Sequence, residues 1–212
     1  MPQIERFEPV SQEKSWGTET LIARDDARAR LGLDGMILIS AGRLVSWKGF
    51  SALIDATEKL VPEIPDIRLI IAGSGPDETV LKKQVKDKGL VGRVRFLGSV
   101  SQKDLWEYFM ASDAFILDSG YEGFSHTVLE AMAAGAPIIV SGAGGNPEMV
   151  RHGKEGIVIS YGDDGALADA IRAIARDPAS ARARAKNASA RAREFSGERM
   201  IKDTIKILTS DF

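Results

Sequence analysis

Short apolar runs alternate with longer amphipathic stretches along most of the chain. Runs this apolar are typical of parallel strands that are buried on both faces of a sheet. They predict strands at Met36–Ala41, Ile67–Ala72, Val94–Leu97, Ala114–Leu117, Pro137–Val140 and Gly156–Ile159. The other stretches predict helices at 50–61, 77–89, 101–111, 125–134, 146–151, 165–176, 179–194 and 197–208. Strand alternating with helix predicts an α/β fold, a doubly wound, Rossmann-like parallel sheet of about six strands.

The length of the chain fits one domain with a sizeable core. Its 212 residues are few for two full domains. We assign residues 34–212 to this domain, including its C-terminal helices. Residues 1–33 are polar and irregular, and we interpret them as a lead-in that contains one short helix near 25–31.

Composition and charge narrow the class of protein. The chain is 44% hydrophobic and 27% charged, which is ordinary for a soluble globular protein. Its formal net charge of -2 supplies no global basic field for nucleic acid. The arginines within 180–193 are better interpreted as the solvated face of a surface helix. The sequence contains no cysteine, which excludes a disulfide framework and a thiolate metal site.

Targeting signals are not evident in the sequence. No apolar run approaches the roughly 20 residues that a membrane span requires. Met1–Val10 carries Glu5 and Glu8 and no apolar stretch, so we expect no signal peptide. We therefore expect a cytoplasmic protein.

The loop after the first predicted strand carries two cations. Doubly wound sheets bind ligands at the carboxyl ends of their strands, so ligand contacts are expected in the segments that follow the strands. Arg43 and Lys48 stand between Gly42 and Gly49, just before a helix. Cations beside a helix N-terminus favour an anion. Two solvated surface charges would explain these residues equally well.

Three other loops are rich in glycine or turn residues but are less informative. Residues 73–75 suit a plain turn between strand and helix, because the full dinucleotide fingerprint is missing. Ser101 is a good helix N-cap, with Asp104 three residues later. The glycine loop at 141–145 leads to a short helix that we expect Asn146 to cap. That loop could lie over a ligand or serve as a structural turn.

The segment after the fourth predicted strand is the most informative. Glu122 lies in a loop before a helix, and Gly123 permits close approach of the backbone. Ser125 is the expected N-cap, which leaves the free N–H groups of the first turn facing the strand ends. Glu130 falls beside core positions of that helix, where a carboxylate needs a partner. Two neighbouring sugar hydroxyls would be such a partner.

Two carboxylates beside a sugar would also suit a glycosidase. We discount that reaction because the neighbouring cations and helix N-terminus favour a phosphate leaving group. His126 and His152 have no evident partners for a triad or a metal set, so we interpret both as non-catalytic. Asp163 and Asp164 do not form an Asp-x-Asp metal motif. We expect no metal and no cofactor, with positive side chains in place of a metal cation.

Taken together, these segments resemble the retaining family 4 glycosyltransferases. Residues 122–130 are similar to the Glu-x7-Glu motif of that family, and residues 131–137 continue the same signature. The other similar segments follow in the family's order, at Gly42–Leu44 with Lys48–Gly49, Gly73–Pro76, Gly98–Ser101 and Gly144–Glu148. The resemblance implies the C-terminal half of a GT-B fold, the domain that binds the nucleotide sugar.

The resemblance also implies roles for individual residues. The domain would bind a UDP-, GDP- or ADP-sugar and stabilise its diphosphate during metal-independent, retaining glycosyl transfer of the hexosyltransferase type. Arg43 and Lys48 would hold the diphosphate and Glu122 would lie by the transferred sugar, so these three are the expected catalytic residues. Glu130 would bind the ribose hydroxyls. The expected donor-binding residues are Gly42, Gly73, Ser74, Gly75, Val100, Gly123, Phe124, Ser125, Leu129 and Glu130.

The sequence departs from the family pattern at several points. Ser125 stands where glycine is frequent, Asp118 where proline or an apolar residue is common, and Gly197 where an aromatic is frequent. The change at Gly197 is expected to loosen docking against a partner domain. Whole GT-B enzymes also have an N-terminal Rossmann domain that binds the acceptor. Ile4–Pro9 is similar to the tail of the stretch between the two domains.

We therefore expect the acceptor-binding domain in cis or in trans, and we expect this chain to be inactive alone. Its partners would be the nucleotide-sugar donor and that domain, with peripheral membrane contact through the domain or the acceptor. Two other interpretations stay open. One is a non-catalytic nucleotide-sugar-binding or regulatory subunit of a split glycosyltransferase. The other is a different GT-B enzyme such as an epimerase or a phosphorylase, although no pyridoxal-phosphate lysine motif is evident.

Overall fold

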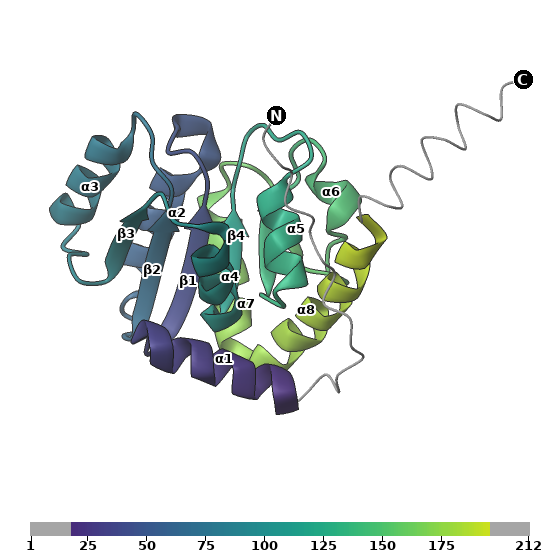
Figure 1. The fold of residues 1–212 in the computed structure, drawn as a ribbon. Coiled ribbons are helices and arrows are strands. Elements are labelled where there is room, and N and C mark those ends of the chain that lie inside the picture. The colour runs from purple at the N-terminus through teal and green to yellow at the C-terminus, as the bar shows by residue number, and fades with distance from the viewer. Residues whose placement is uncertain (1–17, 196–212) are drawn as a thin grey trace, which may run out of the picture.

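Residues 18–195 are described by a computed structural model of the chain. Their strands are β1 (Met36–Ala41), β2 (Ile67–Ala72), β3 (Val94–Gly98), β4 (Ala114–Leu117), β5 (Ile138–Ser141) and β6 (Ile157–Ile159). These strands form one parallel sheet in the order β3-β2-β1-β4-β5-β6 (Figure 1). The order reverses between β1 and β4, as in doubly wound α/β sheets.

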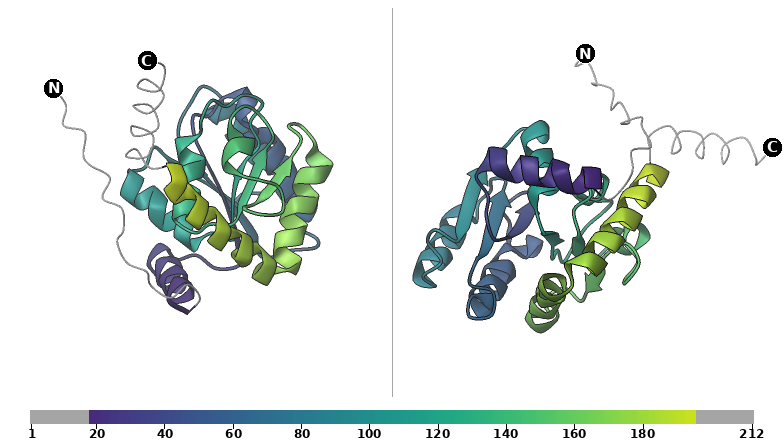
Figure 2. Two further views of the ribbon diagram at one scale, coloured as in Figure 1. Left: turned by 90° about the vertical axis from the view of Figure 1, so that its right-hand side faces the viewer. Right: turned by 90° about the horizontal axis from the view of Figure 1, so that it is seen from below.

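Helices lie on both faces of this sheet. The α-helices are α1 (Thr18–Leu31), α2 (Phe50–Leu60), α3 (Glu78–Asp87), α4 (Gln102–Ala111), α5 (His126–Ala133), α6 (Asn146–Met149), α7 (Asp164–Arg176) and α8 (Pro178–Ala192). Two short 3-10 helices are η1 (Ser46–Lys48) and η2 (Arg193–Phe195). Helices α2, α3 and α7 cover one face, and α4, α5 and α8 cover the other (Figure 1, Figure 2).

Strand β1 shows why both faces need a cover. Successive strand residues point to opposite faces of a sheet. Leu38 belongs to the core under α2 and α7, whereas Ile37 and Ile39 belong to the core under α4 and α5. All three side chains are fully buried. Burying one such side chain contributes about 1.5–3 kcal/mol, so two hydrophobic cores hold the sheet at the centre of the fold.

Helix α1 extends further toward the N-terminus than the sequence predicts. It begins at Thr18, well before the expected short helix, and packs against α4. The Arg28 Nε donates to the carbonyl of Ala111 at 2.8 Å. Arg24 and Arg28 both form ion pairs with Asp113. Because polar contacts to distant residues hold this helix, its length is underestimated from the hydrophobic pattern.

The doubly wound α/β sheet predicted from the sequence is confirmed. All six predicted strands are present to within one residue at each end. The predicted helix at 146–151 is shorter and ends at Met149. The predicted helix at 197–208 and the interdomain similarity at Ile4–Pro9 lie outside the described residues. In the part of the chain that the structure describes, no helix is long and apolar enough to cross a membrane.

Candidate functional site

The carboxyl ends of β1 and β4 meet where the strand order reverses. Loops 42–49 and 118–125 leave the sheet at this point, which is the usual ligand position in doubly wound sheets. The backbone N–H of Gly120 donates to the carbonyl of Trp47 at 2.8 Å and so joins the two loops. All three predicted catalytic residues lie on these loops.

Gly49 lets the two loops approach closely. Its φ of 70° and ψ of 10° are left-handed, a conformation that favours glycine. A Cβ atom at this position would overlap the backbone carbonyl of Asp118. Any other residue would therefore push apart the loops that carry Lys48 and Glu122.

Lys48 and Glu122 form an ion pair between the two loops. Lys48 Nζ lies 2.5 Å from Glu122 Oε1, and the two side chains are 20% and 9% exposed. An ammonium group has three N–H donors, so Glu122 can orient Lys48 while two donors remain for an anion. Arg43 lies on the same loop as Lys48, and its side chain is exposed. The structure therefore brings two of the predicted catalytic side chains together and leaves the third in solvent.

The loop after β5 supports the backbone of Glu122. Gly144 has a φ of 55°, and a Cβ atom there would overlap the carbonyl of Glu122. The N–H of Gly145 donates to the carbonyl of Gly123 at 3.0 Å. The sequence leaves open whether this loop covers a ligand or serves as a structural turn. These contacts show that Gly144 and Gly145 have a structural role.

A buried pair of serines fixes the start of loop 118–125. The N–H of Ser119 donates to Ser141 Oγ at 3.0 Å. The Ser141 hydroxyl donates back to the carbonyl of Ser119 at 2.5 Å. Both serines are fully buried. The backbone near Glu122 is thus held from β5 as well as from its own strand.

Helix α5 begins as predicted, directly after this loop. Ser125 Oγ accepts a hydrogen bond from the N–H of Val128 at 3.4 Å. Ser101 caps α4 in the same way through the N–H of Asp104 at 3.1 Å. The N-terminus of a helix carries partial positive charge. The start of α5 therefore adds to the positive character that Lys48 gives the site.

The predicted cap of α6 is wrong. Gly145, not Asn146, occupies the N-cap position. Asn146 is fully buried, and its side-chain amide donates to the carbonyl of Ser141 at 3.1 Å. A polar side chain that suits a cap in the sequence instead ties α6 to the end of β5.

Glu130 has a partner that the sequence does not indicate. Its Oε1 accepts a hydrogen bond from Nε2 of Gln102 at 2.7 Å. Gln102 is the first residue of α4 and follows the Ser101 cap, but its residue type gives no sign of a role here. Glu130 Oε2 takes no part in this contact and can accept hydrogen bonds from a ligand.

The other predicted donor-binding residues lie beside this point. The N–H of Gly73 donates to the carbonyl of Gly98 at 2.7 Å, and that of Leu44 donates to the carbonyl of Ser74 at 3.0 Å. The hydroxyls of Ser74 and Ser99 are 3.2 Å apart. These bonds join the loops after β1, β2 and β3 into a continuous rim. Three of the remaining predicted residues lie on this rim: Gly42, Gly75 and Val100. Gly123 and Phe124 lie just before α5, and Leu129 lies within that helix.

Asp118 is a buried carboxylate at the end of β4. It is 3% exposed, and its Oδ1 has no hydrogen-bond partner among residues 18–195. Burial raises the pKa of Asp118 to about 6, although the N–H of Gly162 acts in the opposite direction, and the charge of Asp164 raises it further. A proline or apolar residue, common at this position in the family that the sequence resembles, would avoid the cost of burying a charge.

Asp118→Asn is expected to stabilise the chain above pH 6. A raised pKa means that the folded state holds the proton more tightly, so the stability from this group is present below pH 3.8 and is lost as the pH rises to about 6. An amide of the same shape has no charge to bury. The free energy of unfolding at neutral pH should therefore rise by about 1–3 kcal/mol. Urea unfolding of both proteins between pH 4 and pH 8 measures this, and identical pH dependence would contradict it.

The histidines take no part in these contacts. His126 is exposed in the first turn of α5. His152 Nδ1 lies 3.0 Å from the carbonyl oxygen and 3.2 Å from the backbone nitrogen of Val158, which gives it a structural place in a turn. Among the described residues, no group of three or more His, Cys, Asp or Glu side chains is placed to hold a metal ion.

A cavity of about 550 Å³ lies at the opposite, amino edge of the sheet. Met36, Ile174 and Ala181 are among its apolar lining residues. Arg24 and Asp113 in its wall already pair with each other. The carboxyl edge has a hollow of about 380 Å³ lined by residues 142–143 and 158–161. The amino-edge cavity is the larger of the two, but the carboxyl edge has both the reversal of strand order and the Lys48–Glu122 pair.

The chain matches a known protein family over most of its length. The family model described as glycosyl transferases group 1 matches residues 23–192. The chain belongs to the glycosyl transferases group 1 family. Its sheet has the fold of the C-terminal domain of GT-B glycosyltransferases, as the sequence predicts.

Curated relatives of this group 1 glycosyltransferase chain are much longer than the matched region. Mannosylfructose-phosphate synthase of Agrobacterium fabrum is 36% identical over 160 residues, which cover 72% of this chain and 33% of that protein. The lipopolysaccharide core biosynthesis glycosyltransferase LpsE of Rhizobium meliloti is 34% identical over 161 residues, which cover 76% and 46%. The chain thus spans between a third and a half of the length of these relatives.

Solved structures of other proteins have a similar fold. Anabaena Alr3699/HepE in complex with UDP superposes with a TM-score of 0.81 and 28% identity, covering 89% of this chain and 53% of that one. The sucrose-phosphate synthase of Thermosynechococcus elongatus superposes with a TM-score of 0.79 and 32% identity, covering 88% and 48%. A second Alr3699/HepE structure, in complex with UDP-glucose, has a TM-score of 0.79.

Proposed function

We propose that this chain is the donor-binding domain of a cytoplasmic, retaining glycosyltransferase. It binds a nucleoside diphosphate sugar at the carboxyl edge of its sheet and stabilises the departing diphosphate without a metal ion. A second Rossmann-like domain, in cis or in trans, holds the acceptor. The observation that carries the proposal is the Lys48–Glu122 ion pair at the point where the strand order reverses. The 28% identity to a structure that contains UDP supports it.

The diphosphate is the part of the donor that this site suits best. Glu122 engages one N–H of Lys48, and the two others can donate to phosphate oxygens. Arg43 on the same loop is free to swing onto the phosphates with a planar set of donors. The first turn of α5 adds backbone N–H groups and the positive end of the helix dipole. In transfer, these groups stabilise the negative charge that grows on the leaving group.

The nucleoside would extend from the diphosphate along the rim toward β2 and β3. Glu130 would accept hydrogen bonds from the ribose hydroxyls through the oxygen that Gln102 leaves open. The backbone at 73–75 and at Val100 would flank the base. Backbone contacts of this kind place the base with little help from side chains.

The transferred sugar would lie beside Glu122. That carboxylate is 9% exposed and is held by Lys48 and by the backbone of the loop after β5. A fixed carboxylate can orient sugar hydroxyls and steady positive charge on an oxocarbenium-like ring. The bond from the sugar to the diphosphate breaks, and the acceptor oxygen forms its new bond on the same face, which retains the configuration. The proton of the acceptor hydroxyl passes to the departing diphosphate oxygen.

Calorimetric titration of the chain with UDP, GDP and ADP tests the proposal, with uridine, guanosine and adenosine as controls. At least one diphosphate should bind, and more tightly than its nucleoside. A hydrogen bond to a charged group contributes about 1.5–3 kcal/mol, which converts to about tenfold or more in affinity. Binding of none of the three diphosphates would overturn the proposal. Equal affinity for nucleoside and diphosphate would contradict the role given to the cations.

A further inference from the structure

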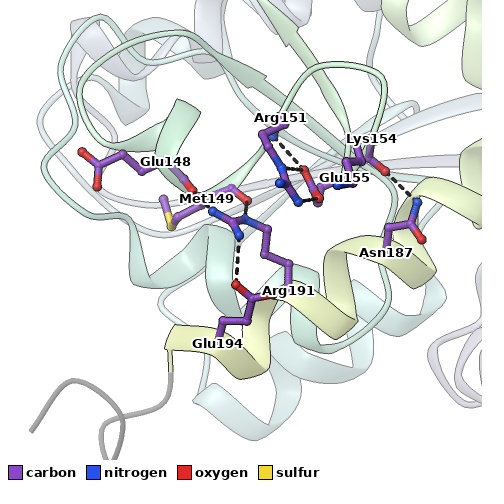
Figure 3. Close-up of polar contacts among 8 residues, drawn as sticks. All are labelled: Glu148, Met149, Arg151, Lys154, Glu155, Asn187, Arg191 and Glu194. Atoms are coloured by element: carbon purple, nitrogen blue, oxygen red, sulfur yellow. Dashed lines mark hydrogen bonds and ion pairs between the residues drawn. The ribbon is translucent and has the colours of Figure 1, made fainter. Parts of the chain in front are cut away.

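Arg191 at the end of α8 makes a set of contacts behind the site (Figure 3). Its guanidinium donates to the carbonyl of Glu148 at 2.7 Å and to that of Met149 at 3.1 Å. A third bond, at 3.0 Å, goes to the carboxylate of Glu194. The side chain is 20% exposed. The last carbonyls of a helix lack partners within the helix, so Arg191 satisfies the C-terminal end of α6.

The turn that follows α6 is held as well (Figure 3). Asn187 of α8 donates to the carbonyl of Lys154 at 3.0 Å. Within the turn, Arg151 pairs with Glu155, which is 1% exposed. Burial alone would raise the pKa of Glu155, but the hydrogen bonds from Arg151 outweigh it and lower the pKa. Helix α8 thus holds α6 and its turn at two points.

The first route from Arg191 to the site runs through α6. Gly145 is the N-cap of α6, so the held helix leads directly into the glycine loop after β5. In that loop, Gly144 packs against the backbone of Glu122, and the N–H of Gly145 donates to the carbonyl of Gly123. A displacement of α6 would therefore be passed to the loop that carries Glu122.

The second route runs through two aromatic rings. The Arg191 guanidinium carbon lies 5.1 Å from the centroid of the Phe195 ring. The Phe195 and Phe124 rings have centroids 5.3 Å apart and are tilted by 59°. Both spacings are those of favourable cation–π and aromatic contacts. Phe124 belongs to the same loop as Glu122, so Arg191 reaches this loop from two directions.

We propose that Arg191 is a positioning residue for the Glu122–Phe124 segment. It sets the geometry of the segment through α6 and through Phe195, without touching the donor. The effect on donor binding rests on the function proposed above, whereas the effect on the geometry of the segment does not. The proposal thus extends the donor site to the end of α8.

Arg191→Met removes the donors and the charge but keeps an unbranched stem, and Arg191→Lys restores the charge. Arg193→Met is the matched control, since Arg193 is an exposed arginine of η2. In the ligand-free chain, Arg191→Met should shift the amide resonances of Gly123, Phe124 and Gly145. Affinity for UDP-glucose should fall by about twofold to thirtyfold, the range for residues that act without ligand contact. Arg191→Lys should recover part of both effects, and Arg193→Met should change neither.

Unshifted resonances of Gly123 and Phe124 in folded Arg191→Met would overturn the proposal, and so would unchanged affinity for UDP-glucose in a chain that binds it. Phe195→Leu breaks only the second route, so it should shift Phe124 and leave Gly145 in place. If Arg191→Met does not fold, Phe195→Leu is used in its place. An unshifted amide resonance of Phe124 in that variant would then overturn the proposal. If the unmodified chain binds none of UDP, GDP and ADP, the proposed function fails, while the resonances still decide whether Arg191 positions the loop.

Discussion

Replacing Arg43 and Lys48 together with alanine is expected to weaken binding of the preferred nucleoside diphosphate by about 100-fold or more. Each residue would contribute a charge-assisted hydrogen bond of about 1.5–3 kcal/mol to the diphosphate, and every 1.4 kcal/mol is about tenfold in affinity. Affinity for the corresponding nucleoside should change little, because the proposed base site lies along residues 73–75 and Val100. Calorimetric titration of the variant with both ligands measures the difference.

The control for this variant is the replacement of Lys83 and Lys86 by alanine. Both are exposed on α3, outside the loops that carry the site, and their loss changes the net charge of the chain by the same amount. Diphosphate affinity should be unaffected there. Removing Lys48 leaves Glu122 without its cation, so unfolding of each variant is measured alongside binding. Full affinity in a folded double variant at Arg43 and Lys48 would remove the proposed anion site.

Gly144→Ala is expected to destabilise the chain and to lower diphosphate affinity together. The added Cβ atom meets the carbonyl of Glu122, and the φ of 55° is itself unfavourable for alanine. Left-handed backbone costs alanine about 1–2 kcal/mol, and overpacking adds about 1–3 kcal/mol. Because the backbone of Glu122 must move to relieve the overlap, the Lys48–Glu122 pair should be disturbed as well.

Gly89→Ala separates these two costs. Gly89 has a φ of 66°, but a Cβ atom there would meet nothing within 4 Å. This control should therefore show the backbone cost alone, with diphosphate affinity unchanged. Urea unfolding and calorimetric titration of both variants provide the comparison. Equal losses of stability in the two variants would contradict the view that the loop after β5 supports Glu122.

The sheet could be predicted from the sequence because its signal is local. A strand buried on both faces is apolar at most positions, as in β1 and β2, and the segments between strands are long enough for helices. The start of α1 could not be predicted in this way. Arg24 and Arg28 hold that helix through ion pairs with Asp113, which is distant in the chain. A hydrophobic pattern does not indicate contacts between charged residues.

The candidate site was predictable where a residue type limits the chemistry. Arg43 and Lys48 follow the first strand and predict an anion site, and Glu122 follows the fourth strand. The structure brings Lys48 and Glu122 together, while their roles toward a ligand stay predictions. The partners of such residues are harder to predict. Gln102 reaches Glu130 only because α4 and α5 lie side by side in the fold (Figure 1).

Side chains with two plausible roles were also hard to assign. Asn146 suits a helix cap in the sequence, yet it is buried and bonds to Ser141. A single sequence does not distinguish an asparagine that caps a helix from one whose buried amide bonds to a neighbouring strand. The contacts of Arg191 are hidden for a similar reason, because an alanine- and arginine-rich helix resembles a solvated surface helix unless its neighbours are known.

The central claim is that a nucleoside diphosphate binds at the carboxyl ends of β1 and β4. The most direct measurement is a titration of the ¹⁵N-labelled chain with UDP, followed through its amide resonances. The largest shifts should come from loops 42–49 and 118–125, from the first turn of α5 and from residues 73–75. Shifts confined to the amino-edge cavity near Ala181, or no saturable shifts with UDP, GDP or ADP, would contradict the claim.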